Sequence, residues 1–365
     1  MHYTVNNKKF YNVFAALSYA AHNCPHEHVY FDIYSQEFDK QDWTVYPESS
    51  YESLFALRAR QIRNKCNKVG VAFSGGTDSV TVLKSFLDNN IKVDFVYIGY
   101  IKTANDNLLS YFYDPAKQIE WIKNRWPKES ESIDFIVKDI SDFSQQVNHY
   151  SNEEYVIDET QTKNLKFSPP LYDDYLKEEF DTRYKTSWKL VTGNEIPHVS
   201  GDQSFYVDKT FAYIFNKDYL EFFFITPDLP EIAIKQSHDL KKYNSLSIDN
   251  YYIKKKMVGC SADTFGQSKL EKKVMTSYSR DVIEKIDFKR VSAFDDFVKQ
   301  ENLPYHNFFK SDQNKKYVTN WFNGYAMLNT DQTLINYMIK HGYLDNEHQP
   351  VQGYHGIKSK ERKLS

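Results

Sequence analysis

The chain has 365 residues and a mass of 43.2 kDa, which predicts one large domain or two closely packed domains. Its 46 basic and 49 acidic side chains leave a net charge of -3, without the basic excess of a dedicated nucleic-acid-binding protein. No apolar run reaches the ~18 residues of a membrane helix, so we expect a soluble protein with no membrane partner.

The three cysteines, Cys24, Cys66 and Cys260, are far apart in the sequence and form no CxxC pair. This spacing argues against both a disulfide framework and a zinc ribbon. A reducing compartment, the cytoplasm, is therefore the expected location.

Residues 1–50 predict a small N-terminal attachment. Val13–Ala21 is a short helix-like patch, and apolar and polar positions partly alternate in the strand-like segment His28–Tyr34. The next segment, Ser50–Lys65, has apolar residues near helical spacing and arginines on its other faces, which predicts an amphipathic helix.

Residues 51–225 predict an α/β domain because strand patterns alternate with helix patterns. The apolar run Val69–Phe73 predicts a strand, and a helix is predicted over Asp78–Asn89, after a glycine-rich turn. The later elements are, in chain order, a strand at Ile91–Tyr100, a helix at Pro115–Trp126 and strands at Ile133–Val137 and Trp188–Thr192. This alternation predicts a doubly wound parallel sheet.

The remaining regions give less specific patterns. Residues 141–187 are polar and contain Pro169-Pro170, which predicts either helices or a long insertion over the cleft. From Pro230 onward the pattern turns largely helical. We therefore expect residues 226–365 to form a mainly helical C-terminal region that completes the cleft.

Between the first predicted strand and its helix lies a loop of six small or polar residues: Ser74, Gly75, Gly76, Thr77, Asp78 and Ser79. Such a loop offers backbone N–H groups and a helix N-terminus to one anion, and its glycines let a phosphate approach closely. The Ser74 and Ser79 hydroxyls can donate to phosphate oxygens, and Asp78 suits Mg²⁺, which prefers oxygen ligands.

The alternative interpretation of this loop is an ordinary tight turn in which Ser79 or Asp78 caps the helix. Two flanking serines, an acidic residue at a fixed offset and the strand–helix context favour phosphate binding instead. The loop is not a Walker loop, because the GxxxxGK[ST] pattern is absent.

The segment VAFSGGTDSVTVL resembles the SGGxDS signature of the N-type ATP pyrophosphatases, the PP-loop superfamily, which includes the synthetase domain of asparagine synthetase. The resemblance implies an adenine nucleotide alpha hydrolase-like fold, ATP and Mg²⁺ as cofactors, and cleavage of ATP between its α and β phosphates. Adenine is then expected at the end of the second strand, at Ile98 and Gly99, because ligands of open α/β sheets bind at the carboxyl ends of strands.

A second segment, KLVTGNE, is similar to the strand and turn that precede an acidic metal-binding pair in asparagine synthetase. The following residues, GNEIPHVSGDQ, depart from the compact acidic turn of that enzyme. Glu195 and Asp202 are therefore both candidate metal ligands beside Asp78, and Glu195 is also a candidate catalytic residue. An ordinary strand end with surface carboxylates is the alternative.

The C-terminal tail is basic and interrupted by glycines. Several relatives close their cleft with a C-terminal lysine that stabilises developing negative charge, and Lys358 and Lys360 are the residues that resemble it. A frayed terminus is the alternative.

Together these features predict an ATP-dependent synthetase that adenylylates a carboxylate or an amide-type oxygen of a small-molecule substrate. Pyrophosphate leaves, and a nitrogen nucleophile then displaces AMP with formation of a C–N bond. The nitrogen comes from free ammonia, from a separate glutaminase or modification complex, or from an amine of the substrate. A built-in glutaminase is not expected, because its nucleophilic cysteine would follow the initiator methionine, where this chain has His2.

Three other functions stay open. The chain is alternatively a non-catalytic nucleotide-binding subunit, or a PAPS-reductase-like or nucleoside- or tRNA-modifying PP-loop enzyme. The isolated cysteines disfavour the sulfur- and zinc-dependent members of this group. The Asn-, Lys- and Tyr-rich composition is similar to that of asparagine-synthetase-like proteins of tailed bacteriophages, a setting that suggests nucleotide modification.

Overall fold

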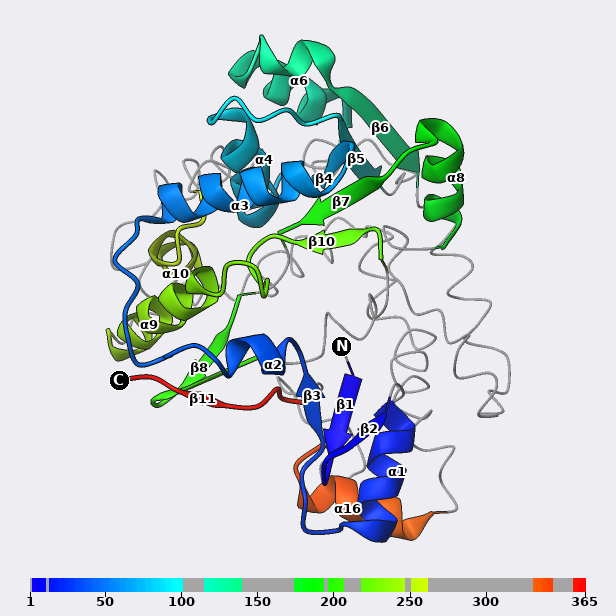
Figure 1. Ribbon diagram of the computed structural model, residues 1–365, viewed down its shortest axis with the longest axis vertical. Coiled ribbons are helices and arrows are strands. Elements are labelled where there is room, and N and C mark those ends of the chain that lie inside the picture. Colours follow the sequence, from blue (N-terminus) through cyan, green and yellow to red (C-terminus); the bar gives the residue numbers. More distant parts are fainter. Residues whose placement is uncertain are drawn as a thin grey trace, which may run out of the picture.

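The computed structural model describes residues 2–10, 13–100, 115–139, 174–193, 196–206, 218–246, 251–261, 331–343 and 357–365. Within these residues, every helix is too short or too polar to cross a bilayer. The predicted α/β class is confirmed by a five-stranded parallel sheet flanked by helices (Figure 1).

The parallel sheet has the strand order β10-β7-β4-β5-β6. Its strands are β4 (Lys68–Ala72), β5 (Phe95–Tyr100), β6 (Asp134–Asp139), β7 (Trp188–Thr192) and β10 (Leu220–Phe222). Numbered by their order in the chain and counted from the β6 edge, these strands run 3-2-1-4-5. The chain leaves β4 toward one edge of the sheet and returns to β7 on the other side of β4, so the strand order reverses between β4 and β7.

Helices cover both faces of this sheet because successive strand residues point to opposite sides. Val96 and Ile98 pack into the cluster under α3 (Tyr51–Lys65), α4 (Thr77–Leu87) and α6 (Pro115–Arg125). Phe95 and Tyr97 face the other way, toward Phe180 of α8 (Asp174–Tyr184), with ring centroids 5.1 and 6.1 Å from the Phe180 ring. A short 3-10 helix, Glu129–Ser132, leads into β6.

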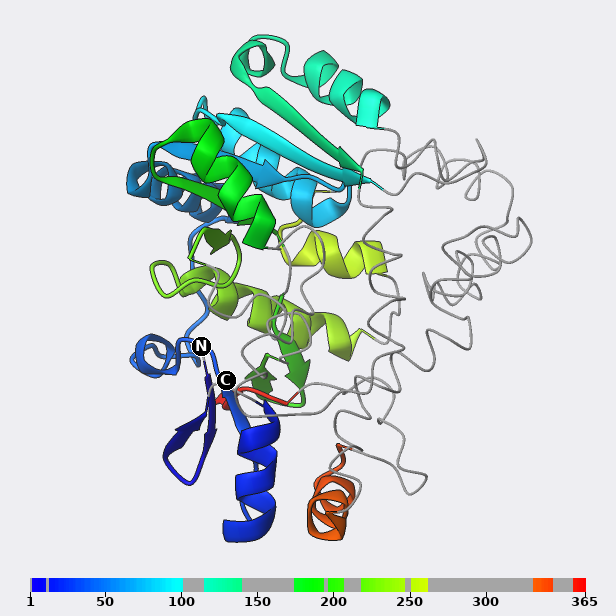
Figure 2. The ribbon, with the colours of Figure 1, turned by 90° about the vertical axis from the view of Figure 1, so that its right-hand side faces the viewer.

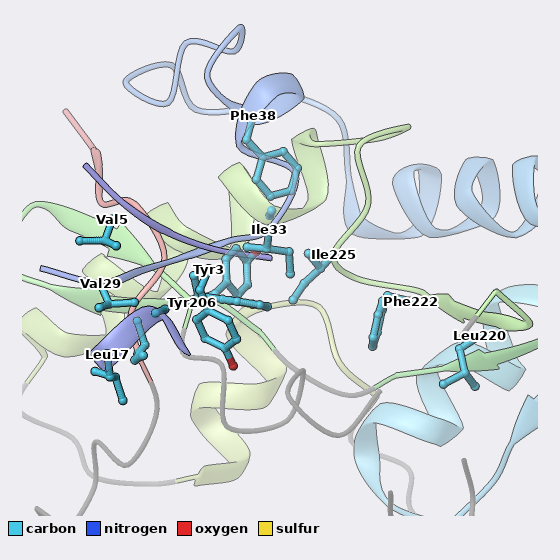
Figure 3. Close-up of a cluster of buried hydrophobic side chains, with 14 of the residues drawn as sticks. Tyr3, Val5, Leu17, Val29, Ile33, Phe38, Tyr206, Leu220, Phe222 and Ile225 are labelled. Carbon is cyan, nitrogen blue, oxygen red and sulfur yellow. The ribbon is translucent and has the colours of Figure 1, made fainter. Parts of the chain in front are cut away.

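The N-terminal segment folds as an antiparallel sheet in the order β2-β1-β3. Its elements are β1 (His2–Val5), β2 (Lys8–Phe10), α1 (Val13–Asn23), β3 (Tyr30–Asp32) and α2 (Ser35–Phe38). Helix α16 (Gln332–Lys340) packs on α1 (Figure 1). Figure 3 shows Tyr3, Val5 and Leu17 in the apolar cluster that continues through Tyr206 and Ile225 to Phe222. The N-terminal segment and the parallel sheet therefore share one apolar cluster.

A third small sheet contains the C-terminal residues. It has the order β11-β9-β8, with β8 (His198–Ser200), β9 (Gln203–Phe205) and β11 (Arg362–Lys363) all antiparallel. Next to β11, Ser359 forms a parallel bridge with Phe31, and the Phe31 N–H donates to the Lys358 carbonyl at 2.9 Å. We use the name terminal unit for residues 2–38, 331–343 and 357–365.

Several sequence predictions are confirmed by these elements and others need correction. The strand predicted at Trp188–Thr192 is confirmed with the same first and last residues. The helices predicted at Val13–Ala21, Ser50–Lys65 and Pro115–Trp126 are also confirmed, and their observed ends differ from the predicted ends by at most two residues. Strands β1, β2, β8, β9 and β11 were not predicted. The tail does not fray, because Ser359 is buried and β11 pairs with β9.

The mainly helical prediction for residues 226–365 holds for α9 (Glu231–Ser245), α10 (Tyr251–Met257) and α16, but not for β11. The domain boundaries at residues 50 and 225 stay predictions. Residues 141–173, most of the predicted polar insertion, lie outside the described residues.

Candidate functional site

Residues 74–79, named the phosphate loop after their predicted role, extend from the carboxyl end of β4 into the first turn of α4. Phe73 still belongs to the sheet, because its N–H donates to the Tyr97 carbonyl at 2.9 Å. Gly75 then has a φ of 74°, a left-handed conformation that favours glycine. Helix α4 follows at Thr77, so the backbone N–H groups of its first turn point beyond the end of the strand.

Two serine hydroxyls fix the shape of the loop. The Oγ atoms of Ser74 and Ser79 are 3.2 Å apart, and Ser79 Oγ also accepts from the Ser74 N–H at 3.2 Å. Ser79 Oγ donates in turn to the Gly76 carbonyl at 3.1 Å. Ser79 is buried, whereas Ser74 is exposed and its hydroxyl can turn toward a ligand. The loop is therefore held in place before any ligand binds.

The end of β7 packs directly against the first turn of α4. A Cβ atom added to Gly193 would lie 2.7 Å from the carbonyl oxygen of Asp78, closer than van der Waals contact allows. Only glycine fits here. This contact places the loop at the point where the strand order reverses, which is where open α/β sheets bind their ligands.

The carboxylate of Asp78 is bound by a lysine from a distant helix. Lys255 Nζ of α10 lies 2.8 and 2.9 Å from the two carboxylate oxygens. The Lys255 side chain is only 8% exposed, and the Asp78 side chain 25%. A buried ammonium group therefore stands beside the phosphate loop, although 177 residues separate the two partners in the sequence.

The end of α10 explains how Lys255 reaches the loop. The Cys260 N–H donates to the Lys255 carbonyl at 2.9 Å and the Gly259 N–H to the Lys256 carbonyl at 3.1 Å, with Gly259 at a φ of 80°. These are the two hydrogen bonds of a Schellman motif. The Ser261 N–H then donates to Thr81 Oγ1 of α4 at 2.7 Å, so the motif docks α10 onto α4.

Cys260 is the third side chain at this carboxylate. Its Sγ donates to Asp78 Oδ1 at 3.4 Å. Burial, with a further contribution from the Asp78 charge, raises the pKa of the Cys260 thiol well above its usual range. The thiol is therefore neutral at physiological pH and lacks the thiolate that nucleophilic cysteine chemistry needs.

The structure keeps the six loop residues together and places the end of β5 beside the end of β4, where the loop begins. Ile98 is fully buried in the core of the sheet, and Gly99 is half-buried near the end of β5. Asp202 lies in the turn between β8 and β9, where its backbone carbonyl accepts from the Leu364 N–H at 2.7 Å. That Asp202 and Asp78 hold one metal ion stays a prediction. Glu195 lies outside the described residues.

The tail lysines lie elsewhere. Lys360 Nζ pairs with Asp39 at 2.7 Å, and Lys358 Nζ lies 4.4 Å from the centre of the Phe205 ring. The pairing of β11 with β9 holds both lysines in the terminal unit. Figure 2 shows the C-terminal segment on the far side of α9 from α4. In this structure, neither lysine belongs to the phosphate loop, and Lys255 has the position expected of a site lysine.

Lys255 and Cys260 were missed by sequence analysis because neither has a local signal. The run Lys254-Lys255-Lys256 has the composition of a solvated helix face, but in the folded chain the docking of α10 on α4 buries the middle lysine and leaves Lys256 exposed. Among the described residues, no group of three or more His, Cys, Asp or Glu is arranged to hold a metal ion. Comparison of the chain with family models, with curated proteins and with solved structures found no match.

Proposed function

We propose that this chain is an ATP-dependent synthetase of the PP-loop ATP pyrophosphatase type, with an adenine nucleotide alpha hydrolase-like fold. It would adenylylate a carboxylate or amide-type oxygen of a small molecule, release pyrophosphate, and pass the activated group to a nitrogen nucleophile, as asparagine synthetase does. The observation that carries this proposal is the phosphate loop at the reversal of the strand order, with a buried lysine beside it. The three free cysteines suit the cytoplasm as its location.

The loop supplies the groups that hold a triphosphate. The N–H groups of the first turn of α4 and the positive end of its dipole attract phosphate oxygens. Ser74, which is exposed, adds a hydroxyl donor. Because Gly75 and Gly76 carry no side chain, the phosphate can approach the backbone itself.

Lys255 supplies the positive charge that the departing pyrophosphate needs. A preorganised cation in a site shielded from water stabilises developing negative charge more than water does. In the structure this charge is neutralised by Asp78. A nucleotide in the loop would therefore compete with Asp78 for the ammonium group.

Asp78 is the described residue that fits Mg²⁺. Its carboxylate provides the hard oxygen atoms that this ion prefers, but both oxygens now accept from Lys255. Asp78 would thus exchange Lys255 for the ion, and Lys255 would turn to the phosphates. Bound Mg²⁺ would supply further neutralisation of the phosphate charge.

The test is the release of AMP and pyrophosphate from ATP-Mg²⁺, with mixtures of carboxylates, amines, ammonia and glutamine as acceptors. We expect Asp78→Asn to lower the rate by about 100-fold or more. Asn keeps an acceptor for buried Lys255, so this variant is preferable to alanine. Asp88→Asn, at the other end of α4, is the matched control and should keep the activity.

The identity of the products decides the outcome of this experiment. AMP and pyrophosphate that disappear in Asp78→Asn but persist in Asp88→Asn support the synthetase, and the stimulating additive indicates the substrate class. Release of ADP and phosphate would contradict the proposal, because the superfamily cleaves the bond between the α and β phosphates.

A second candidate function is a nucleotide-binding subunit without catalysis. One observation favours it: the described residues include no group of three or more potential metal ligands. Isothermal titration calorimetry distinguishes the two functions. Saturable ATP binding that needs Ser74 and Lys255, with no turnover in any acceptor mixture, would establish the binding function.

A further inference from the structure

Four histidines belong to the contact of α16 with the end of α1 and the segment that follows it; Figure 1 shows where α16 meets α1. His22, His26 and His28 belong to the N-terminal side of this contact, and His341 follows the last turn of α16. Their chemistry plays no part in the proposed synthetase, because this contact belongs to the terminal unit and not to the phosphate loop.

Two of these rings face each other directly. The Nδ1 atoms of His28 and His341 are 3.2 Å apart, and the rings meet edge to face with centroids 4.5 Å apart. The two residues are 313 positions apart in the sequence. Two imidazole nitrogens at this distance need either a proton or a metal ion between them, because bare lone pairs repel each other.

The tautomer of His341 is fixed by its other nitrogen. Nε2 of His341 lies 3.2 Å from the carbonyl oxygen of Pro25, which can only accept, so Nε2 carries the proton. In the neutral ring Nδ1 is then a bare lone pair aimed at His28. A carbonyl that holds the far nitrogen is the usual outer partner of a metal-binding histidine.

The separation of the two nitrogens suits one metal ion. Histidine nitrogens bind zinc at about 2.0–2.1 Å. For two Nδ1 atoms 3.2 Å apart, an ion at this distance from both would have an N–Zn–N angle of about 100°, close to the tetrahedral angle. His28 is exposed, so its own Nε2 can keep a proton that faces water. We propose that His28 and His341 form a binding site for a first-row transition-metal dication of the zinc class.

The surrounding contacts hold the two rings at this distance. The Tyr337 hydroxyl donates to the Glu27 carbonyl at 2.7 Å, and Lys340 Nζ donates to the Pro25 carbonyl at 3.1 Å. The ring of Tyr337 also packs on His341, with centroids 4.3 Å apart. Residues 25–28 and α16 are therefore fixed against each other before an ion arrives.

Imidazole ligands select zinc, copper and nickel over magnesium and calcium. The described residues contain no group of three or more potential metal ligands, and water would complete the coordination of an ion held by these two rings. An ion bound only when both segments are docked cross-links them, and by mass action it stabilises the docked terminal unit.

The test is a calorimetric titration of the full chain, freed of metal by a chelator, with zinc chloride at pH 7.5. We expect one zinc ion per chain and a rise in the midpoint of thermal unfolding that EDTA reverses. His28→Gln and His341→Gln should each weaken zinc binding at least about 10-fold, since even the loss of an outer partner costs that much.

His22→Gln is the matched control. It removes a histidine from the same contact, where Nε2 pairs with Asp331 at 2.5 Å, but it leaves the two facing rings intact. Zinc binding should survive this change. The proposal is overturned if the unaltered chain binds no zinc, if His22→Gln weakens binding as much as His341→Gln, or if His28→Gln leaves binding unchanged. Far-ultraviolet circular dichroism confirms that each variant is folded.

Discussion

The phosphate loop and the terminal unit are held together by different kinds of contact. The loop takes its shape from residues within six positions of each other, such as the Ser74 and Ser79 hydroxyls. The terminal unit joins segments more than 300 residues apart, such as Phe31 with Ser359 and His28 with His341. The first kind of contact is encoded in a short motif, whereas the second exists only in the folded chain.

The difference predicts what substitutions do. Changes at the loop should alter binding and turnover with little effect on the rest of the fold. Changes in the terminal unit should lower the stability of that unit before they affect the rest of the molecule. Side chains that link elements from different parts of the chain should affect the whole molecule, and these come first below.

The largest effect is expected from Arg58→Met. Arg58 is fully buried in α3 and donates to Glu221 at 2.5 Å, to the Phe222 carbonyl at 2.7 Å and to Asp228 at 3.2 Å. Its removal leaves Glu221, 15% exposed, without its guanidinium partner, and we expect a loss of about 3–5 kcal/mol in unfolding free energy.

Urea denaturation measures this loss, with Arg60→Met on the exposed face of the same helix as the control. If Arg58→Met lowers the stability no more than Arg60→Met, the link between α3 and β10 is not energetically important.

The next effect concerns the loop itself. Lys255→Met removes the buried cation beside Asp78, and we expect a fall in AMP release of about 100- to 1,000-fold, equivalent to about 2.7–4 kcal/mol in the barrier. Lys256→Met, its exposed neighbour, is the control and should stay near the unaltered rate. Equal rates for the two variants would remove Lys255 from the proposed mechanism.

Asp94 predicts a specific pH dependence of stability. Burial alone would raise the pKa of this carboxyl, but hydrogen bonds from Arg63, from the Val69 N–H at 2.9 Å and from Lys68 at 3.2 Å outweigh it and lower the pKa. Its stabilisation is therefore complete above the unfolded pKa of about 3.9 and is lost as the pH falls through the lower folded pKa.

We expect Asp94→Asn to cost about 1.5–3 kcal/mol at pH 7, because hydrogen bonds to a charged group are lost. The difference from the unaltered chain should shrink below about pH 4, where Asp94 of the unfolded chain takes up a proton first, and should level off only below the lowered folded pKa. Urea denaturation at several pH values measures this difference in unfolding free energy. Glu120→Gln, a change at an exposed residue, serves as the control. A difference that stays constant down to pH 2 would rule out this role for Asp94.

The smallest effect is expected at the start of α16. Asp331 caps this helix by accepting from the N–H groups of Thr333 and Leu334 at 3.1 and 3.2 Å. Asp331→Ala should cost about 0.5–2 kcal/mol and speed amide hydrogen exchange in α16 more than in the parallel sheet. Asp331→Asn keeps an equally good helix cap but removes the negative charge that pairs with His22. If Asp331→Asn lowers the stability as much as Asp331→Ala, the ion pair with His22 and not the cap is responsible for the loss.

The sequence predicted the elements whose stabilising contacts are mainly local or strongly patterned. Residues 188–192 are a compact apolar-rich run, and α4 has apolar residues at helical spacing behind a glycine turn, so both were recognised. Strands of two to four residues are too short to give a strong pattern: β1 alternates over only four residues, and β2 and β11 show no alternation. This is why the tail was expected to fray or to close the cleft.

The candidate site was predicted in the same uneven way. The loop was predicted from six contiguous residues, because a phosphate-binding loop requires small residues at fixed spacing. Lys255 could not be found by spacing, because its role depends on how the end of α10 docks on α4. Asp202 was named because it follows a segment similar to the strand and turn before an acidic metal-binding pair, and the structure places it in the turn of the β8–β9 hairpin.

The bridge between Phe31 and Ser359 has a consequence for synthesis on the ribosome. At about 5–20 residues per second, the first partner waits roughly 15–60 s for the second to be made. All five described strands of the parallel sheet end by Phe222, so their hydrogen-bonded pairing can form while translation continues. During that time the edge of β3 lacks its Ser359 partner and is open to chaperones and proteases.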